Sequence, residues 1–462
     1  MHNNRTPKYE KRRKLATFAT DMQMNRDIIR LAVPNIISNV TVPLMGIAST
    51  AIAGHWGTDT AATIGALAIG ASIFNFIYWN CSFVRMGTSG LTAQAYGAQD
   101  WTECTTMLAR ALLVAAIIGL LILALQWPLG ELALHIMKGD AMTRDYFYAR
   151  IWAVPAGILL FGFNGWFTGM QNAVIPMATA IVVNLIHIGC SFLFAFGLDQ
   201  GIVGIAYASV LAQYIGVALS VGLLWGRYGD MLTTIDWRRV VDFEPMRNFF
   251  RINRDIMIRT LCNVIVYTFF TAASARMGDA KILAVNTLLM QLFTLFSYMT
   301  DGFAYAAEAL TGRFIGARDP KRLRLCINRS MLWSVAIALL FVSAYIFGWR
   351  DLLTLFVDES DAASGEILAL AGQYIAWIVM IPIFCAIPFA LDGIMIGATE
   401  SRVMRNSMVL ATIAFFSLYY IGLPLIGNNA LWAAFTLYML CRGAFQYLLT
   451  NRLQTLYEKA SR

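Results

Sequence analysis

Long apolar runs separated by short polar or basic segments are the dominant pattern of the chain. The run 151–198, for example, contains no Asp, Glu, Lys or Arg, and it is long enough to cross a bilayer core of about 30 Å twice. Apolar runs bounded by charges and by Gly, Pro and Asn breaks predict twelve membrane-spanning helices. In the first half of the chain they are expected near residues 29–54, 61–85, 106–129, 148–170, 174–198 and 202–226, and in the second half near 252–275, 282–310, 329–349, 367–393, 404–426 and 429–451.

The chain also contains an internal repeat, which lies at the end of the second span of each half. Residues 79–100 read WNCSFVRMGTSGLTAQAYGAQD, and residues 298–319 read YMTDGFAYAAEALTGRFIGARD. The matching positions are Leu91, Thr92, Gly97, Ala98 and Asp100 in the first stretch, and Leu310, Thr311, Gly316, Ala317 and Asp319 in the second. Two halves of six spans share one orientation, because six is even. The sequence therefore predicts an all-α polytopic membrane protein with two six-helix lobes related by a pseudo-two-fold axis along the membrane normal, an organisation typical of secondary transporters.

Composition and charge agree with this pattern. Of 462 residues, 58% are hydrophobic and 13% are charged, whereas a soluble domain is about 25% charged. Lys and Arg concentrate near the N-terminus, in the central polar segment and after the eighth span, whereas 351–366 is acidic. The positive-inside rule therefore predicts a multi-pass protein of the inner (plasma) membrane with both termini in the cytoplasm. The net charge of +8 then reflects topology, and we expect no nucleic-acid partner.

The basic N-terminal segment lacks an apolar h-region and a small-residue cleavage site, so we expect the first span to act as an uncleaved insertion signal. We expect a monomer surrounded by membrane lipids. The predicted organisation is a cytoplasmic basic segment 1–28, an N-terminal lobe 29–226, a cytoplasmic inter-lobe loop 227–251, a C-terminal lobe 252–451 and a cytoplasmic tail 452–462.

Four longer motifs make the pattern more specific. They are RMGTSGLTAQAYG at 85–97, RDIMIRT at 254–260, DGFAYAAEAL at 301–310 and LDGIMIGATESRVMRN at 391–406. With twelve spans in two lobes, the chain resembles the multidrug and toxic compound extrusion (MATE) family from about residue 27 to 451, and within it the DNA-damage-inducible, DinF-type branch. The resemblance implies export coupled to protons or sodium ions, often of lipophilic cations.

The chain departs from the family pattern in its first half. Many prokaryotic relatives carry an aspartate in the first span, in a motif that matches GIASTAIAG here, where the position is Ser49. Relatives outside the DinF-type branch often carry an Asn and an Asp in the fifth span, where this chain has His187 and Ser191. The resemblance therefore implies that the usual acidic ion site of the N-terminal lobe is missing, and the family's coupling residues do not carry over cleanly.

An antiporter needs a group whose protonation or ion occupancy differs between its two access states, and ionisable residues inside a span rarely persist without a function or a buried partner. In the C-terminal lobe, Asp255 and Arg259 are four residues apart and can pair on one helix face. Helix rise places the set in the cytoplasmic third of the membrane, with Glu308 nearer the interface. Two interpretations stay open: a network that closes a cytoplasmic gate, or direct coupling with Asp301 and Asp392 as carriers. The candidates are Asp301, Asp392 and Asp255 for coupling, and Arg259, Glu308, Arg85 and Arg254 for the network or gate.

The second coupling candidate is His187, which lies about thirteen residues into the fifth predicted span and is expected to be the only ionisable residue at that depth. Histidine changes charge near physiological pH and could load a proton. Asn184 and Ser191 share its helix face at i−3 and i+4. The alternative is a neutral histidine that is hydrogen-bonded by one of them.

A substrate path should be apolar with a few polar anchors, and aromatic faces can bind organic cations. The resemblance places the cleft walls on spans one, two, seven and eight, although aromatic residues at helical spacing also suit packing or contact with lipid. The cleft candidates are Asn75, Tyr78, Trp79, Thr294, Tyr298, Asn184 and Ser49.

The sequence thus favours a secondary active antiporter that exports small amphipathic or cationic compounds by alternating access between two lobes, with H⁺ or Na⁺ as coupling ion and no other cofactor. The alternative is a flippase for a lipid-linked or other lipophilic substrate. Lys and Arg are scarce near the midplane, which argues against a pyrophosphate-linked cargo. No DDxxD, HxxxxD or metal-ligand cluster occurs, and the four histidines are scattered. An enzyme, a metal site and, without a P-loop, an ATP-driven pump are therefore not expected.

Overall fold

The computed structural model describes residues 7–56, 59–278, 280–356 and 362–461, and in these ranges the chain is helical without strands. Eleven of the described helices are long and apolar enough to cross a membrane. In the first half the elements are α1 (Pro7–Gly54), α2 (Thr60–Cys81), α3 (Phe83–Gly97), α4 (Trp101–Ala124), α5 (Gln126–Met137), α6 (Ala141–Arg150), η1 (Ile151–Ala153), α7 (Val154–Gly169), α8 (Val174–Phe192), η2 (Leu193–Gly197) and α9 (Gly201–Leu232).

The second half follows the short helix α10 (Trp237–Val240). Its elements are α11 (Phe243–Arg276), α12 (Ala280–Gly316), α13 (Pro320–Thr354), α14 (Ala362–Gly397), α15 (Ser401–Ile426), α16 (Asn428–Leu449) and α17 (Gln454–Lys459). The helix α16 has 22 residues and packs along α15, so it takes the place of the twelfth predicted span.

The helix ends differ from the predicted ones, because a helix continues past the apolar run that marks its bilayer crossing. The helix α1 already begins at Pro7. The second span runs from Thr60 to Gly97 with a break at Ser82 that separates α2 from α3. The helix α9 continues to Leu232 and α11 begins at Phe243, so the segment that joins the halves is shorter than its polar composition indicated.

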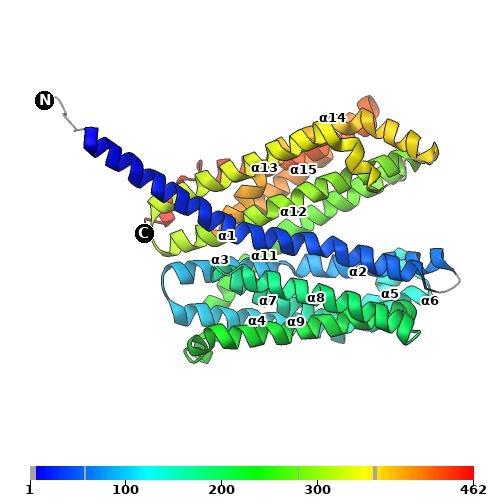
Figure 1. The fold of residues 1–462 in the computed structure, drawn as a ribbon, viewed down its shortest axis with the longest axis horizontal. Helices are drawn as coiled ribbons and strands as arrows, with labels where there is room; N and C mark the ends of the chain where they lie inside the picture. Colours follow the sequence, from blue (N-terminus) through cyan, green and yellow to red (C-terminus); the bar gives the residue numbers. More distant parts are fainter. Residues whose placement is uncertain (1–6, 57–58, 279, 357–361, 462) are drawn as a thin grey trace.

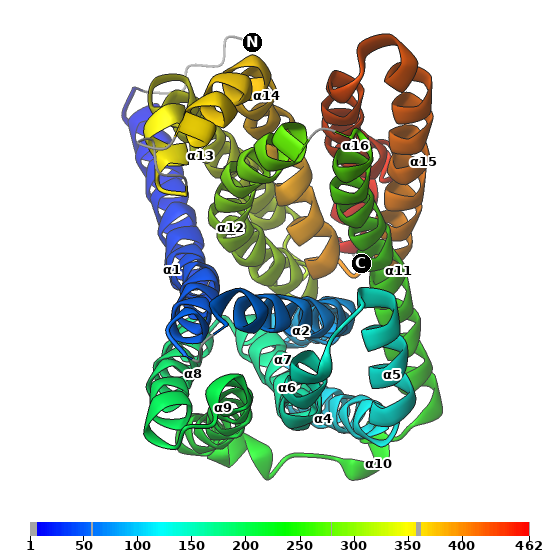
Figure 2. The same cartoon turned by 90° about the vertical axis from the view of Figure 1, so that its right-hand side faces the viewer.

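The helices form two groups that converge at one end of the molecule and diverge toward the other (Figure 1). The lower group in Figure 1 contains α2 to α9, and the upper group contains α12 to α16. Figure 2 looks onto the diverging end and shows the two groups as separate bundles with α1 and α11 along their sides. These groups are the N lobe and the C lobe.

The first long helix of each half contacts both lobes. Leu31 and Ala32 of α1 pack in a core of the C lobe with Phe303, whereas Ile52 and Ala53 pack in a core of the N lobe. The helix α11 begins against the N lobe and continues into the C lobe. Its Phe249 packs against Met107 and Val114 of α4, and its Phe270 lies in the C-lobe core. Each lobe is therefore held to the other by a continuous helix.

The internal repeat marks the point of closest approach between the lobes. A Cβ atom added at Gly97 would lie 2.0 Å from the carbonyl oxygen of Arg313, and one added at Gly316 would lie 1.9 Å from that of Gln94. The ends of α3 and α12 therefore touch backbone to backbone, and the contact is reciprocal. We call this end of the molecule the closed end; α17 lies there, because Lys459 donates to the carbonyl oxygen of Ala398 at 2.6 Å.

The repeat also sets how the following helices begin. Asp100 accepts a hydrogen bond from the backbone N–H of Glu103 at 2.9 Å, and Asp319 accepts one from that of Arg322 at 3.0 Å. Aspartate side chains at this position satisfy N–H groups that have no partner within the helix. The two aspartates of the repeat thus start α4 and α13, in agreement with two related halves.

The same relation extends to the fourth and tenth spans. Cβ atoms added at Gly165 and Gly169 of α7 would lie 2.4 and 2.8 Å from the carbonyl oxygens of Arg85 and Ser89. In the C lobe, Cβ atoms at Gly393 and Gly397 of α14 would lie 2.1 and 2.2 Å from those of Ala304 and Glu308. In the N lobe α7 therefore packs on α3, and in the C lobe α14 packs on α12, each through two glycines one turn apart. The two helix pairs are equivalent, as the pseudo-two-fold relation predicts.

Candidate functional site

A cavity of about 160 Å³ lies in the C lobe, at its boundary with α3 of the N lobe. Three carboxylates and three guanidinium groups line it, so the formal charges of these six side chains cancel. They come from five helices: Arg85 from α3, Arg259 from α11, Asp301 and Glu308 from α12, Asp392 from α14 and Arg442 from α16.

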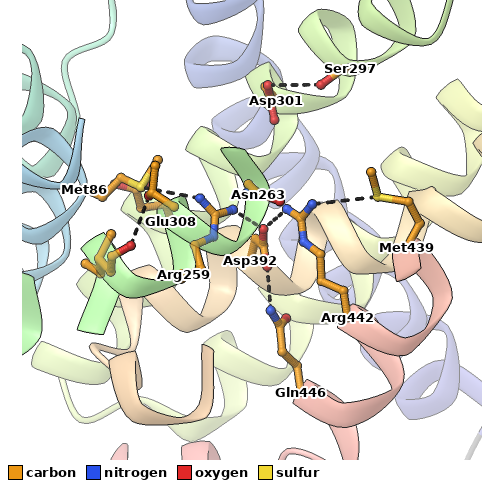
Figure 3. Close-up of polar contacts among 12 residues, drawn as sticks. Met86, Arg259, Asn263, Ser297, Asp301, Glu308, Asp392, Met439, Arg442 and Gln446 are labelled. Carbon is orange, nitrogen blue, oxygen red and sulfur yellow. Dashed lines mark hydrogen bonds and ion pairs between the residues drawn. The ribbon is translucent and has the colours of Figure 1, made fainter. Parts of the chain in front are cut away.

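Asp392 is the centre of a buried ion cluster, and it is 4% exposed. It accepts hydrogen bonds from both Arg259 and Arg442, and Nε2 of Gln446 donates to its Oδ1 at 2.5 Å (Figure 3). With two cations on one carboxylate, the cluster carries a local charge of +1. Asp392 is thus held in place by three donors and has little freedom to exchange an ion.

Asp301 lies in the same cavity but apart from this cluster (Figure 3). The hydroxyl of Ser297 donates a hydrogen bond of 3.5 Å to its Oδ2. Within the described part of the chain it forms no ion pair. Of the three carboxylates in this cavity, Asp301 is therefore the one that no arginine pairs with in the described part of the chain.

Besides the two ion pairs on Asp392, the cavity contains an ion pair that joins the two lobes. Nη2 of Arg85 lies 3.5 Å from Oε2 of Glu308, and their side chains are 11% and 0% exposed. The guanidinium of Arg85 also lies 4.1 Å from the ring centroid of Tyr305. Packing of α3 on α12 encloses the side chain of Glu308 completely. The pair is placed to hold the lobes together on the closed-end side of the cavity.

We expect Glu308→Gln to weaken this attachment by about 1–3 kcal/mol, because Arg85 would remain buried without its charge partner. The readout is the distance between spin labels at Ala98 and Ala317, two exposed and pseudo-equivalent positions at the ends of α3 and α12, in a cysteine-free background. The distribution should shift to longer distances. Glu131→Gln, which removes an exposed pair with Arg144 inside the N lobe, should leave it unchanged. An unchanged distribution in Glu308→Gln would show that the pair does not hold the lobes.

A second cavity, of about 260 Å³, lies between α2 of the N lobe and α11 and α12 of the C lobe. Trp79 and Thr294, two of the predicted cleft residues, line it. Tyr267 lines both this cavity and the one that contains Asp301, so the two adjoin. The other side chains of its wall include Phe270, Asn286, Met290 and Gln291.

His187 is 3% exposed and lies in the N lobe, away from both of these cavities. Its Nε2 lies 2.9 Å from the hydroxyl of Ser209 on α9. The expected partners Asn184 and Ser191 are thus wrong, since the sequence indicates neighbours on the same helix but not those on the next one. His187 is also not alone at its depth, because Arg150 lines the same small cavity.

Asp255, the third carboxylate predicted for coupling, lies apart from Asp301 and Asp392. Its carboxylate is fully buried against α15, where Arg405 Nη1 and Ser401 Oγ lie 2.6 and 3.1 Å away, and Arg254 Nη2 is 3.3 Å away. The expected pair of Asp255 with Arg259 does not form. Because Asp255 and Arg254 do not line the cavity, they belong to the packing of α11 on α15.

The remaining cleft candidates are not brought together. Tyr78 lines the cavity of His187, whereas Asn75 is exposed. Ser49 donates to the carbonyl oxygen of Met45 on its own helix at 2.9 Å. Asn184 and Tyr298 are partly buried and line none of these three cavities.

The residue that sequence reasoning missed most clearly is Arg442, one of the two cations on Asp392. Its signal was a single charge inside the apolar run 429–451. Arg150 was missed in the same way, at the edge of the run 148–170. Arginines are therefore less scarce inside the protein than the sequence indicated: three line the C-lobe cavity, but three carboxylates balance them, so that cavity is not strongly cationic.

Comparison with solved structures defines the class of protein. A crystal structure described as MATE in the bent conformation superposes with a TM-score of 0.84 at 17% sequence identity, over 96% of this chain and 99% of that one. This likeness shows the fold, which is the twelve-helix, two-lobe architecture of a MATE transporter.

Sequence comparison then places the chain. The MatE family model matches residues 34–193 and 256–425, one stretch in each half. The DNA damage-inducible protein F of Escherichia coli (strain K12) is 37% identical over 425 residues, 89% of each chain. The probable multidrug resistance protein NorM of Deinococcus radiodurans is 24% identical over 91% of this chain and 93% of that one. The chain belongs to the MATE family of multidrug and toxic compound efflux transporters, and is therefore a transporter and not an enzyme.

Proposed function

We propose that the protein is a secondary active antiporter that exports small amphipathic cations in exchange for an inward flow of H⁺ or Na⁺. The observation that carries the proposal is Asp301, a carboxylate of the C-lobe cavity that forms no ion pair with an arginine in the described ranges. Proton and sodium coupling both require one group that is alternately occupied and free.

The charges of the cavity give the coupling a physical basis. With Asp301 ionised, the six charged side chains sum to zero; with Asp301 protonated or bound to Na⁺, the sum is +1. A cationic substrate is repelled by the second state and tolerated by the first. Occupancy of Asp301 and binding of the substrate therefore compete, and competition at one site between two ligands is sufficient for exchange.

The adjoining cavity supports an amphipathic substrate. Its walls combine the rings of Trp79, Tyr267 and Phe270 with the flexible side chain of Met290. Aromatic faces attract organic cations, and methionine adapts to irregular apolar shapes. A substrate with its apolar part in this cavity could direct its charge past Tyr267 toward Asp301.

The arrangement of the lobes supports alternating access. We assign the closed end to the cytoplasm, because the basic segments near both termini and after α12 favour that side. The lobes diverge at the opposite end (Figure 2), so this conformation would open to the outside of an inner membrane. Return to the other state would require the ends of α3 and α12 to separate.

The test is transport into proteoliposomes. Purified protein is reconstituted, and uptake of a fluorescent organic cation is followed under an imposed pH gradient and then under a sodium gradient. We expect one gradient to drive transport in the wild type and Asp301→Asn to abolish it, because a neutral amide cannot take up a proton or replace the charge. His187→Ala should keep gradient-driven transport.

Two outcomes would contradict the proposal. Loss of coupling in His187→Ala with full activity in Asp301→Asn would place the coupling group in the N lobe. Absence of transport under both gradients, with circular dichroism showing folded protein, would exclude this class of substrate for the cation used.

A further inference from the structure

A small cavity of about 10 Å³ lies inside the N lobe, apart from the two inter-lobe cavities. This volume holds about one water-sized species. Its polar wall comes from four helices: Tyr78 from α2, Arg150 from α6, His187 from α8, and Ser209 and Gln213 from α9. No carboxylate belongs to this wall.

Arg150 is the one permanent charge in the wall, and it lies inside the span 141–169. It forms no ion pair within the described ranges of the chain. It donates a hydrogen bond to the hydroxyl of Tyr146, and its guanidinium lies 4.8 Å from the ring centroid of Phe74 and 5.5 Å from that of Tyr146. A charged side chain inside the membrane normally faces a counter-charge or water. Arg150 thus differs from the three arginines of the C-lobe cavity, each of which has a carboxylate partner.

Donors around this cavity are also left without acceptors. Nε of Arg150 and the hydroxyl of Tyr78 are buried and have no hydrogen-bond partner; on the acceptor side, Nδ1 of His187 and Oε1 of Gln213 in the same wall are also buried without one. The hydroxyl of Ser209 donates to the carbonyl oxygen of Ile205 at 3.1 Å, so it accepts from His187 Nε2 and offers the cavity no further donor. Unsatisfied buried donors are costly, and an anion between Arg150 and Tyr78 would satisfy both.

We infer that Arg150 and Tyr78 form a binding site for one small monovalent anion in the N lobe. A single charge matches the one guanidinium, and the volume limits the ligand to a halide ion or the end of a carboxylate group. The site is separate from the coupling carboxylate, and a bound anion would supply the counter-charge that Arg150 lacks.

The test uses the thermal unfolding midpoint of the purified full-length protein in detergent, which needs neither a gradient nor a transported cargo. The sodium salts of chloride, bromide, acetate, butyrate and gluconate are compared at constant ionic strength. We expect chloride and bromide to raise the midpoint saturably, and gluconate, whose hydroxyl-bearing carbon makes its carboxylate end bulkier than that of acetate or butyrate, to have no such effect. A rise with acetate and butyrate but not with halides would identify a carboxylate end as the ligand and would still support the anion site.

Three variants separate binding from general salt effects. Arg150→Gln should remove the saturable rise. Arg144→Gln should keep it, because that arginine of the same helix is half exposed and paired with Glu131. Tyr78→Phe removes one donor with little change in shape and should raise the half-saturating concentration roughly tenfold; it decides the question if Arg150→Gln does not fold.

The inference is overturned if none of chloride, bromide, acetate and butyrate raises the midpoint of the wild type more than gluconate does, or if the rise persists in Arg150→Gln. It is also overturned if the half-saturating concentration is the same in Tyr78→Phe as in the wild type.

Discussion

Asp392→Asn is expected to lower the free energy of unfolding by about 3–5 kcal/mol, because it leaves two buried guanidinium groups without their shared carboxylate. Arg259 and Arg442 are 9% and 4% exposed in their side chains, so water cannot replace the lost charge. The hydrogen bond from Gln446 to this side chain would also weaken. The measurement is the unfolding midpoint of the purified protein in detergent, read from tryptophan fluorescence.

The matched control is Glu366→Gln, which breaks an exposed pair with Lys281 and should change stability by less than about 1 kcal/mol. A second comparison tests the mechanism directly. Adding Arg442→Met to Asp392→Asn should recover part of the loss, because one of the unpaired charges is then removed. Equal effects of Asp392→Asn and Glu366→Gln would show that the cluster does not stabilise the fold.

Gly316→Val is expected to disfavour the closed end and thereby to lower the rate of transport strongly. A Cβ atom at this position would lie 1.9 Å from the carbonyl oxygen of Gln94. A backbone atom cannot turn away as a side chain can, so α3 and α12 would have to separate. Overpacking of this kind costs about 1–3 kcal/mol, which falls on the closed conformation alone and shifts the population toward the other state.

The readout is again the distance between labels at Ala98 and Ala317, measured together with transport. The distance should lengthen in Gly316→Val while the protein stays folded. Gly348→Val on α13 is the control, because a Cβ atom there would meet nothing within 4 Å. A wild-type distance in Gly316→Val would mean that the two helix ends are not the point at which the conformations differ.

The helices themselves could be predicted from the sequence to a large extent. Apolar run length reports whether a segment lies in lipid, and this information is local, so the sequence predicted each of the eleven described spanning helices and the position of α16. The ends of the helices were not predicted correctly. The helices α9 and α11 show the reason, because each continues into polar residues outside the bilayer core. The break at Ser82 was also missed, since the apolar run passes through it.

The partners of the charged residues could not be predicted in this way. Asp255 and Arg259 lie four residues apart, and local spacing suggested a pair, yet Asp392 takes Arg259 from 133 positions away and Arg442 from 50. The spacing of residues on one helix says which face they share. It does not say which face of another helix packs against that face, and this decides which carboxylate remains free.

The sequence by itself thus determined a helical membrane protein with two related lobes. Each segment in lipid must be apolar and must satisfy its own backbone hydrogen bonds, and the repeat is visible in the residues. Only the tertiary structure decided that Asp392 is bound, that Asp301 is open to the cavity, and that Arg150 has no carboxylate beside it. These assignments depend on how close helices that are distant in sequence approach one another, as at Gly97 and Gly316, where the absence of two side chains lets the lobes meet.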